Sequence, residues 1–207
     1  MPVLPRLMLV TDRRACATRE LVEIVAGAAA GGLRLVQVRE RDLPAEELLD
    51  LVGLIRAALG PGGTVLVNGD ADSARRAGAG LHLAAREAPA DAPPRPFGRS
   101  VHDAEEARRA LAERPDYLVV GTIFATDSKP GRAGAGPGLV RAVARLAGTT
   151  PVFAIGGIDE TRVATVLAAG AWGVAVRGAI LCAARPAEAA RSLARALESA
   201  AGARPAV

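Results

Sequence analysis

The chain is poor in aromatic residues and almost devoid of lysine. Its 207 residues include one Trp, one Tyr and three Phe, and only one of the 26 basic residues is a lysine, Lys129. So few aromatic side chains offer no stacking platform for nucleotide bases, and the arginines are interspersed with acidic residues instead of forming a basic stripe. The formal charge of +4 therefore does not indicate a nucleic-acid-binding protein.

Cysteines and long apolar runs are also scarce. The two cysteines, Cys16 and Cys182, lie far apart in sequence and show no metal-ligand spacing, so we expect inert thiols. No apolar run approaches the roughly 18 residues of a membrane span. The first residues, MPVLPRLMLVTD, do not resemble a secretory signal. We expect a cytoplasmic protein without a membrane or nucleic-acid partner, and a homodimer is left open as its assembly.

Short runs rich in Val, Ile and Leu recur along the whole chain, and most are continuous, which is typical of strands buried on both faces. They lie at 6–11, 34–39, 64–68, 80–83, 97–101, 117–121, 152–155 and 173–176. Helical patterns separate them at 19–30, 44–59, 103–113, 138–146, 159–169 and 186–200. This alternation predicts one domain over 1–207, a single TIM (β/α)8 barrel with its core at about 6–200. A doubly wound open sheet is the alternative.

One unit of the predicted barrel is irregular. The segment 84–96 contains Pro89, Pro93, Pro94 and Pro96. Proline removes a backbone donor and clashes with the preceding helical turn, so a full helix is not expected there. We predict that the unit after the fourth strand is shortened to a loop or a single turn.

Polar residues gather just after the predicted strands, where a barrel of this kind places its site. In Gln37-Val38-Arg39-Glu40-Arg41, alternation sends Gln37, Arg39 and Arg41 to one side of the emerging strand. Two guanidiniums at a barrel mouth need anionic partners, and phosphate or pyrophosphate suits their forked geometry. The alternative is a structural network in which these guanidiniums pair with Glu40, Asp42 or Glu87.

Two later segments predict further anion contacts. The loop 121–131, GTIFATDSKPG, is rich in hydroxyls and carries Lys129, whose compact ammonium suits a closing loop. A solvated surface loop is the alternative. The pairs Gly156-Gly157 and Arg177-Gly178 follow the last two strands, and in barrels these loops often form a phosphate cup from backbone amides. Double glycine also occurs in ordinary tight turns.

The chain has only two histidines, and they are predicted to differ in role. His102 follows the fifth strand on the expected active face, so it is a candidate general acid or base. A packed or hydrogen-bonded structural role is the alternative. His82 lies within the fourth strand, where a hydrogen-bonded role in the core is favoured.

Taken together, these motifs resemble the thiamine phosphate synthase and thiazole tautomerase (TenI) family over about residues 6–200. The matching segments are LMLVTD at 7–12, VQVRER at 36–41, VLVNGDAD at 65–72, GLHLA at 80–84, GRSVHDAEEA at 98–107, DYLVVGTIFATDSKPG at 116–131, PVFAIGGI at 151–158 and GAWGVAVRGAI at 170–180. The resemblance implies a TIM barrel and a phosphorylated thiazole as ligand.

The synthase of this family joins a pyrimidine methyl pyrophosphate to thiazole phosphate with Mg²⁺. The resemblance implies that the pyrimidine and its pyrophosphate are held by six residues: Gln37, Arg39, Arg41, Asn68, Ser100 and Lys129. It implies that Thr126 and Ser128 touch the thiazole or the pyrophosphate, and that Gly157 and Gly178 bind the thiazole phosphate.

The chain departs from the synthase pattern at several positions. Arg41 stands where the family has lysine, and Asn68-Gly69 replaces Asn-Asp, so one metal carboxylate is missing. The second metal acid falls at Glu87, while Asp70 and Asp72 are close but displaced. Mg²⁺ prefers one or two carboxylates together with substrate phosphates, so this loss should weaken metal-assisted ionisation.

Asn-Gly and the Arg-Glu-Arg motif are more similar to the tautomerase branch, which needs an acid/base group and no metal. Its catalytic histidine falls at Thr122, which leaves His102 as the remaining proton carrier. We therefore favour a tautomerase-like isomerase. The alternatives are an Mg²⁺-dependent synthase, and a binder of thiazole phosphate or thiamine phosphate without catalysis.

Overall fold

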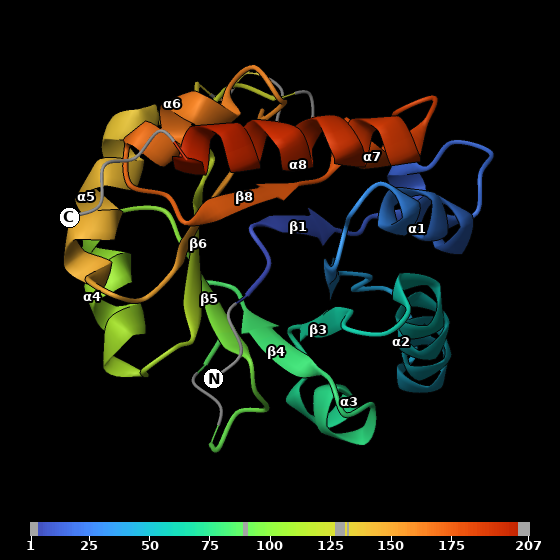
Figure 1. Ribbon diagram of the computed structural model, residues 1–207. Coiled ribbons are helices and arrows are strands. Elements are labelled where there is room, and N and C mark those ends of the chain that lie inside the picture. Colours follow the sequence, from blue (N-terminus) through green and yellow to red (C-terminus); the bar gives the residue numbers. More distant parts are fainter. Residues whose placement is uncertain (1–3, 89–90, 127–130, 132, 203–207) are drawn as a thin grey trace.

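The computed structural model of the chain describes residues 4–88, 91–126, 131 and 133–202. It contains eight parallel strands that close into a barrel in sequence order, with helices on the outside (Figure 1). The strands are β1 (Leu7–Val10), β2 (Leu35–Val38), β3 (Thr64–Asn68), β4 (Gly80–Leu83), β5 (Phe97–Val101), β6 (Tyr117–Gly121), β7 (Val152–Ile155) and β8 (Gly173–Val176). The predicted TIM barrel is thus confirmed, and the open sheet is excluded because β1 pairs with β8.

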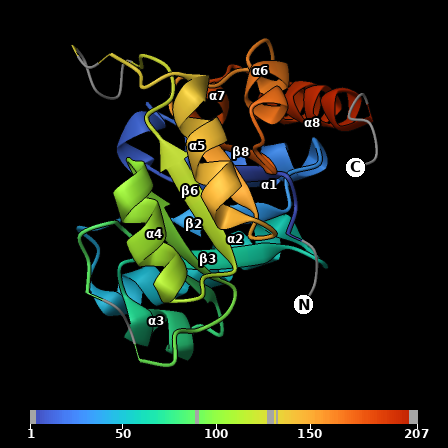
Figure 2. The same ribbon diagram turned by 90° about the vertical axis from the view of Figure 1, so that its left-hand side faces the viewer.

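The helices surround this barrel, as the two perpendicular views show (Figures 1 and 2). They are α1 (Leu21–Ala30), α2 (Ala45–Leu59), α3 (Ala71–Arg76), α4 (Ala104–Ala112), α5 (Pro137–Ala147), α6 (Val163–Ala168), α7 (Gly178–Leu181) and α8 (Pro186–Gly202). A 3₁₀ turn at Arg13–Ala15 follows β1. The N-cap Asp103 begins α4 by accepting a hydrogen bond from the backbone N–H of Glu106 at 2.7 Å.

The helices differ from the prediction in two respects. The short helices α3 and α7 were not predicted, because neither is long enough to display a helical period. Helix α6 begins at Val163 instead of residue 159. The carboxylate of Asp159 accepts hydrogen bonds from the backbone N–H groups of Thr161 and Arg162 at 3.0 and 3.2 Å. This local turn uses the donors that an earlier helix start would require.

The barrel interior is filled by its own small core, separate from the layer between strands and helices. Its buried members are Met8, Val10, Leu35, Leu66, Tyr117, Val119, Phe153 and Ala175. The ring of Tyr117 is fully buried and needs Gly98 opposite it, since a Cβ at Gly98 would lie 2.0 Å from the Tyr117 ring carbon Cζ. The chain's only tyrosine therefore closes the interior below the carboxyl ends of the strands.

The unit between β4 and β5 has no helix in its described residues, 84–88 and 91–96, as predicted. The buried side chain of Arg99 lies beside this loop, outside the barrel. Its guanidinium donates hydrogen bonds to the carbonyls of Ala84 and Glu87 at 2.9 and 3.0 Å and to the Glu113 carboxylate at 3.0 Å. Arg99 thus tethers the loop to the end of α4 where a helix would otherwise pack.

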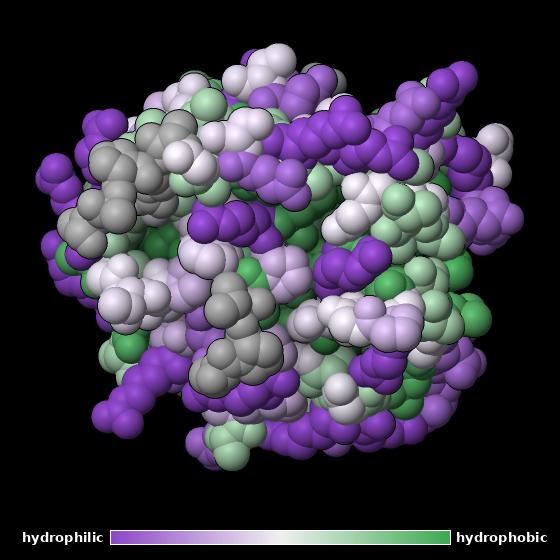
Figure 3. All heavy atoms as spheres, viewed as in Figure 1, coloured by the Kyte–Doolittle hydropathy of each residue, from purple (hydrophilic) through white to green (hydrophobic). Residues whose placement is uncertain are grey.

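On the face shown in Figure 3, hydrophilic side chains lie over α8, and hydrophobic atoms reach the surface on the side of α2. Leu54 on α2 is the most exposed large hydrophobic residue in the described part of the chain. Within that part, no helix combines the length and apolarity needed to cross a membrane.

Candidate active site at the carboxyl ends of the strands

The residues predicted to form a site come from the carboxyl ends of different strands. β2 supplies Gln37 and the segment that carries Arg39 and Arg41, β3 ends at Asn68, and β5 supplies Ser100. The loops after β7 and β8 supply the two glycine-containing turns. Ser128 and Lys129 lie outside the residues that the structure describes.

Gln37 and Asn68 form the floor of the mouth on the β2 and β3 side. The side-chain amide of Asn68 donates a hydrogen bond to Oε1 of Gln37 at 3.1 Å. Gln37 is buried, and its Nε2 lies 3.8 Å from the sulfur of Met8 on β1. Both amides are therefore held in fixed orientations, which suits recognition of a polar, planar ligand.

His82, Ser100 and Tyr117 form a second polar group inside the barrel. His82 is fully buried on β4; its Nδ1 lies 3.0 Å from the Tyr117 hydroxyl and its Nε2 lies 2.7 Å from Oγ of Ser100. Burial, followed by the charge of Arg99, lowers the pKa of His82 to about 3. Burial raises the pKa of Tyr117. The expected hydrogen-bonded core role of His82 is confirmed, and the ring orients the Ser100 hydroxyl.

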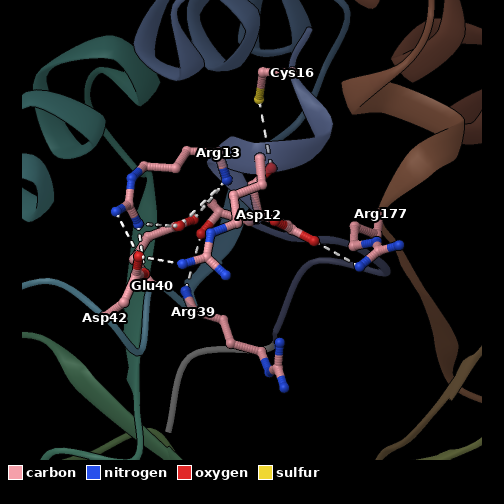
Figure 4. A network of polar contacts seen from close by, with 9 residues as sticks. Asp12, Arg13, Cys16, Arg39, Glu40, Asp42 and Arg177 are labelled. Atoms are coloured by element: carbon pink, nitrogen blue, oxygen red, sulfur yellow. Dashed lines mark hydrogen bonds and ion pairs between the residues drawn. The ribbon is translucent and has the colours of Figure 1, made fainter.

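Arg39 presents a guanidinium that nothing in the described part of the chain engages. Its backbone N–H donates to Oγ1 of the buried Thr11 at 2.9 Å, which fixes the start of the side chain. The side chain then extends away from Glu40 and Asp42 (Figure 4). Burial and the neighbouring guanidinium of Arg41 lower the pKa of Arg39. Arginine nonetheless stays charged at neutral pH, so Arg39 is a partly buried cation that forms no ion pair with any described carboxylate.

The acidic residues that follow Arg39 in the sequence pair with other arginines (Figure 4). The buried Glu40 carboxylate pairs with the Arg13 guanidinium at 3.1 Å, and Asp42 pairs with Arg13 and Arg14, both at 2.7 Å. The hydrogen bond from Arg13 lowers the pKa of Asp42. The predicted alternative, in which Glu40 or Asp42 neutralises Arg39, is therefore wrong.

Asp12 and Arg177 join the first and last strands of the barrel. Oδ2 of Asp12, just after β1, lies 2.6 Å from a guanidinium nitrogen of Arg177, which caps α7 after β8 (Figure 4). The Nε of Arg177 is buried and has no hydrogen-bond partner. The sequence did not indicate this pairing, because it depends on closure of the barrel between residues 165 positions apart.

Arg41 lies between the ends of β3 and β4. Its Nε is 3.4 Å from Oδ1 of Asn68, and a terminal nitrogen is 3.6 Å from Oε1 of Glu87. The predicted structural pairing of an arginine in this segment with Glu87 is thus present for Arg41. Gly69, with φ of 83°, faces the same carboxylate, since a Cβ added there would lie 3.2 Å from Oε1 of Glu87.

The loops after β6 and β7 pack against each other through Gly156 and Gly157, which have φ of 106° and 61°. A Cβ on Gly156 would lie 2.4 Å from Cγ2 of Thr122, and one on Gly157 would lie 2.4 Å from the carbonyl oxygen of Ala125. Positive φ and close approach therefore both require glycine here. The predicted phosphate contacts of these glycines, of Gly178 and of Thr126 stay predictions.

The structure separates His102 from this group. Its side chain is 49% exposed, and Nδ1 lies 2.9 Å from Oε2 of Glu106 on α4. The same carboxylate oxygen accepts a hydrogen bond from the His102 backbone N–H at 2.7 Å. His102 therefore contributes to the start of α4, and its predicted part in proton transfer stays a prediction.

The residues available for a metal ion are few. Of the two predicted metal positions, only Glu87 bears a carboxylate, and its Oε2 accepts a hydrogen bond from the Ala84 backbone N–H at 2.5 Å. Asp70 caps α3 by accepting from the N–H and hydroxyl of Ser73 at 2.9 and 2.6 Å, so it does not compensate for Gly69. Among the described residues, no group of three His, Cys, Asp or Glu side chains could hold a metal. The donor set does not fit a protein-held Mg²⁺.

A second hollow opens at the opposite, amino-terminal end of the strands. It has a volume of about 720 Å³ and is lined mainly by apolar and small residues, including Pro5, Pro96 and Trp172. Its charged members, Arg95 and Asp116, pair with each other at 2.9 Å. The described residues that line this hollow thus include no unpaired cation, unlike those at the carboxyl ends, where barrel sites are generally found.

Comparisons with known proteins bear on the family of the chain. Residues 7–180 match the family model described as thiamine monophosphate synthase. The "Thiamine-phosphate synthase" of Mycolicibacterium gilvum is 42% identical over 211 residues, covering 94% of this chain and 89% of the relative. The "Putative thiamine-phosphate synthase" of Geobacter sulfurreducens is 40% identical, covering 90% and 92%. The solved thiamine phosphate pyrophosphorylase from Pyrococcus furiosus superposes with a TM-score of 0.84 at 29% identity, covering 94% of this chain and 96% of that one.

Proposed function

Because the chain belongs to the thiamine monophosphate synthase family, we propose that it is a thiamine phosphate synthase. In the proposed reaction, the bond between the pyrimidine methylene carbon and its diphosphate breaks, and the thiazole nitrogen of a thiazole phosphate bonds to that carbon. Pyrophosphate is the leaving group. The relatives named as synthases favour this alternative over the tautomerase that the sequence motifs alone favoured.

The observation that carries the proposal is the guanidinium of Arg39, which pairs with no described side chain and follows β2 together with Arg41. Departure of a diphosphate places new negative charge on its oxygens, and fixed cationic donors stabilise that charge in the transition state. Arginine forks bind phosphate oxygens in a bidentate manner. The fixed amides of Gln37 and Asn68 would orient the pyrimidine next to these cations.

A tautomerase requires a positioned group that moves a proton, and the described mouth offers a poor set for that task. His82 is buried and neutral, and both of its ring nitrogens contact hydroxyls. His102 is exposed and contacts Glu106. Thr122 is not a proton carrier at neutral pH, since the hydroxyl of threonine does not titrate in this range.

The tautomerase nevertheless remains the second candidate, and Gly69 favours it. A reaction that moves only a proton needs no metal carboxylate, and Gly69 removes one such carboxylate. A binder of the phosphorylated thiazole without catalysis would be the third outcome.

One purified sample tests these functions together. We expect release of pyrophosphate and formation of thiamine phosphate from the two phosphorylated precursors. Replacing Arg39 with alanine should lower kcat/KM by about 100-fold, because a charge-assisted contact to the leaving group contributes about 1.5–3 kcal/mol. R39K should recover part of the loss. The matched control is R76A, which removes one positive charge from the end of α3, where Arg76 pairs with Glu46.

Proton exchange at the thiazole carbon without synthase turnover would replace the proposal with the tautomerase. Ligand binding with neither activity would replace it with the binder. Equal kcat/KM for R39A and R76A would remove Arg39 from the site.

A further inference from the structure

Arg41, at the position where the family has lysine, lies beside Glu87, the one of the two predicted metal positions that still bears a carboxylate. The guanidinium bridges the ends of two strands, with Nε 3.4 Å from Oδ1 of Asn68 and a terminal nitrogen 3.6 Å from Oε1 of Glu87. An amide oxygen and a carboxylate oxygen are hard oxygen ligands of the kind that Mg²⁺ uses. In this chain a positively charged side chain already lies between them.

The remaining oxygens around Glu87 are unsuited to a divalent ion. Gly69 supplies no carboxylate, although its Cα–H faces the Glu87 side chain, and Oε2 of Glu87 accepts a hydrogen bond from the Ala84 N–H. A Mg²⁺ ion at Glu87 would also have to approach the cationic guanidinium of Arg41, which like-charge repulsion opposes.

The geometry points to diphosphate binding without a protein-held Mg²⁺, with the guanidinium of Arg41 supplying positive charge for the diphosphate of the substrate. This inference rests on the proposed function, because it takes the diphosphate as part of the substrate.

The contacts of Arg41 suit an exchange of partners. A guanidinium carries five N–H donors, and the two contacts that Arg41 makes are long, at 3.4 and 3.6 Å. Its side chain is 51% exposed, so it remains accessible to a ligand from solvent. A pair this exposed contributes little to stability, and a purely structural role therefore does not account for the arrangement.

Arg39 supplies the second cation of this unit. Arg39 and Arg41 alternate along the segment that follows β2, and burial together with the charge of Arg41 lowers the pKa of Arg39. Two neighbouring guanidiniums disfavour each other's charge until an anion neutralises both. A diphosphate carries enough oxygens to accept bidentate hydrogen bonds from two guanidiniums at once.

The experiment measures binding of inorganic pyrophosphate by isothermal titration calorimetry, once with EDTA and once with excess MgCl₂. We expect the wild-type Kd in EDTA to be within about threefold of the Kd in MgCl₂, because the guanidiniums replace the ion. R41A should weaken binding in EDTA on the order of 10- to 100-fold. R41K, which keeps the charge but loses the fork, should fall between them.

The control R76A removes an equally charged side chain outside the mouth and should bind pyrophosphate like the wild type. Circular dichroism verifies that each variant is folded. Wild-type binding that is absent in EDTA, or more than about tenfold weaker there than in MgCl₂, overturns the inference. Wild-type affinity in R41A overturns it as well. Because no turnover is involved, a failed synthase assay and a failed metal-free binding assay are distinguishable.

Discussion

Replacing Arg99 with methionine should destabilise the barrel more than any loss of an exposed ion pair. The side chain of Arg99 is 6% exposed, and its three hydrogen bonds tether the loop after β4 to α4. Methionine preserves much of the volume but leaves two carbonyls and the Glu113 carboxylate without this donor. The Glu113 side chain is only 19% exposed, so water cannot fully replace the lost partner.

The magnitude follows from these contacts. Breaking a buried ion pair by removing one partner costs about 3–5 kcal/mol. Glu113 retains some access to water, so we expect the lower end of that range for R99M, about 3 kcal/mol. In a domain of this size each kcal/mol shifts Tm by about 2–4 °C, which corresponds to a decrease of about 6–12 °C.

Urea unfolding followed by far-UV circular dichroism measures the loss. The double variant R99M/E113Q, which also removes the stranded carboxylate, should recover part of the stability. The control R109M breaks the exposed pair of Arg109 with Glu105 on α4 and should change the free energy of unfolding little. A loss for R99M of less than about 0.5 kcal/mol would refute the claim that the arginine replaces the packing of a missing helix.

Three further predictions concern the polar groups at the mouth. His82 is neutral in the fold, with a pKa of about 3 against 6.5 for the free side chain, so its contribution to stability is present above pH 6.5 and is lost as pH falls toward 3. Between pH 7 and 5 the wild type should lose about 2 kcal/mol of unfolding free energy that H82Q does not lose. An equal change of unfolding free energy with pH in the two proteins, measured by urea titration, would contradict this. H102A should keep kcat within about twofold of wild type in the synthase assay, because the ion pair of His102 within the described residues is with Glu106 on α4. A loss of about 100-fold would return His102 to the mechanism. G69D places a carboxylate beside Glu87, so MgCl₂ should raise the Tm of this variant in thermal melts, while the wild-type Tm should not change. An equal Tm for G69D with and without MgCl₂ would argue against a metal position at residues 69 and 87.

Much of the barrel could be predicted because its strands are short, continuous and sharply bounded. The runs 64–68, 80–83, 97–101, 117–121, 152–155 and 173–176 coincide with β3 to β8. Glycines and prolines mark the ends of these runs, and Val, Ile and Leu occupy both faces. The hydrophobic pattern and the length of each run therefore both indicate a buried strand. Helices α3 and α7 escaped prediction because six and four residues do not establish a helical period.

The positions of the site residues were also accessible from sequence, but their pairing was not. Strand order places Gln37 and Asn68 on adjacent strands, and the structure joins them at 3.1 Å. The Arg99 contacts link β5 to the preceding loop and to α4, and alternation alone says only that Arg99 and Ser100 face opposite sides. Which carboxylate each arginine selects depends on loop geometry, and with 25 arginines against 22 acidic residues composition does not decide it.

The distribution of acidic residues around the mouth explains why an anion site can exist among so many carboxylates. Glu40 faces Arg13, Asp12 faces Arg177 and Glu87 faces Arg41, which leaves Arg39 as the described guanidinium in this group without a partner. A mouth built around a protein-held divalent ion needs a surplus of carboxylates on its inner side, because the ion itself brings the positive charge. Here the inner side carries guanidiniums and neutral amides. Gly69 supplies no side chain, whereas a carboxylate at this position would make the charge of the mouth more negative. Such a mouth attracts a diphosphate before any metal arrives, so the charge of the chain itself, and not that of a bound ion, should set the salt dependence of its substrate affinity.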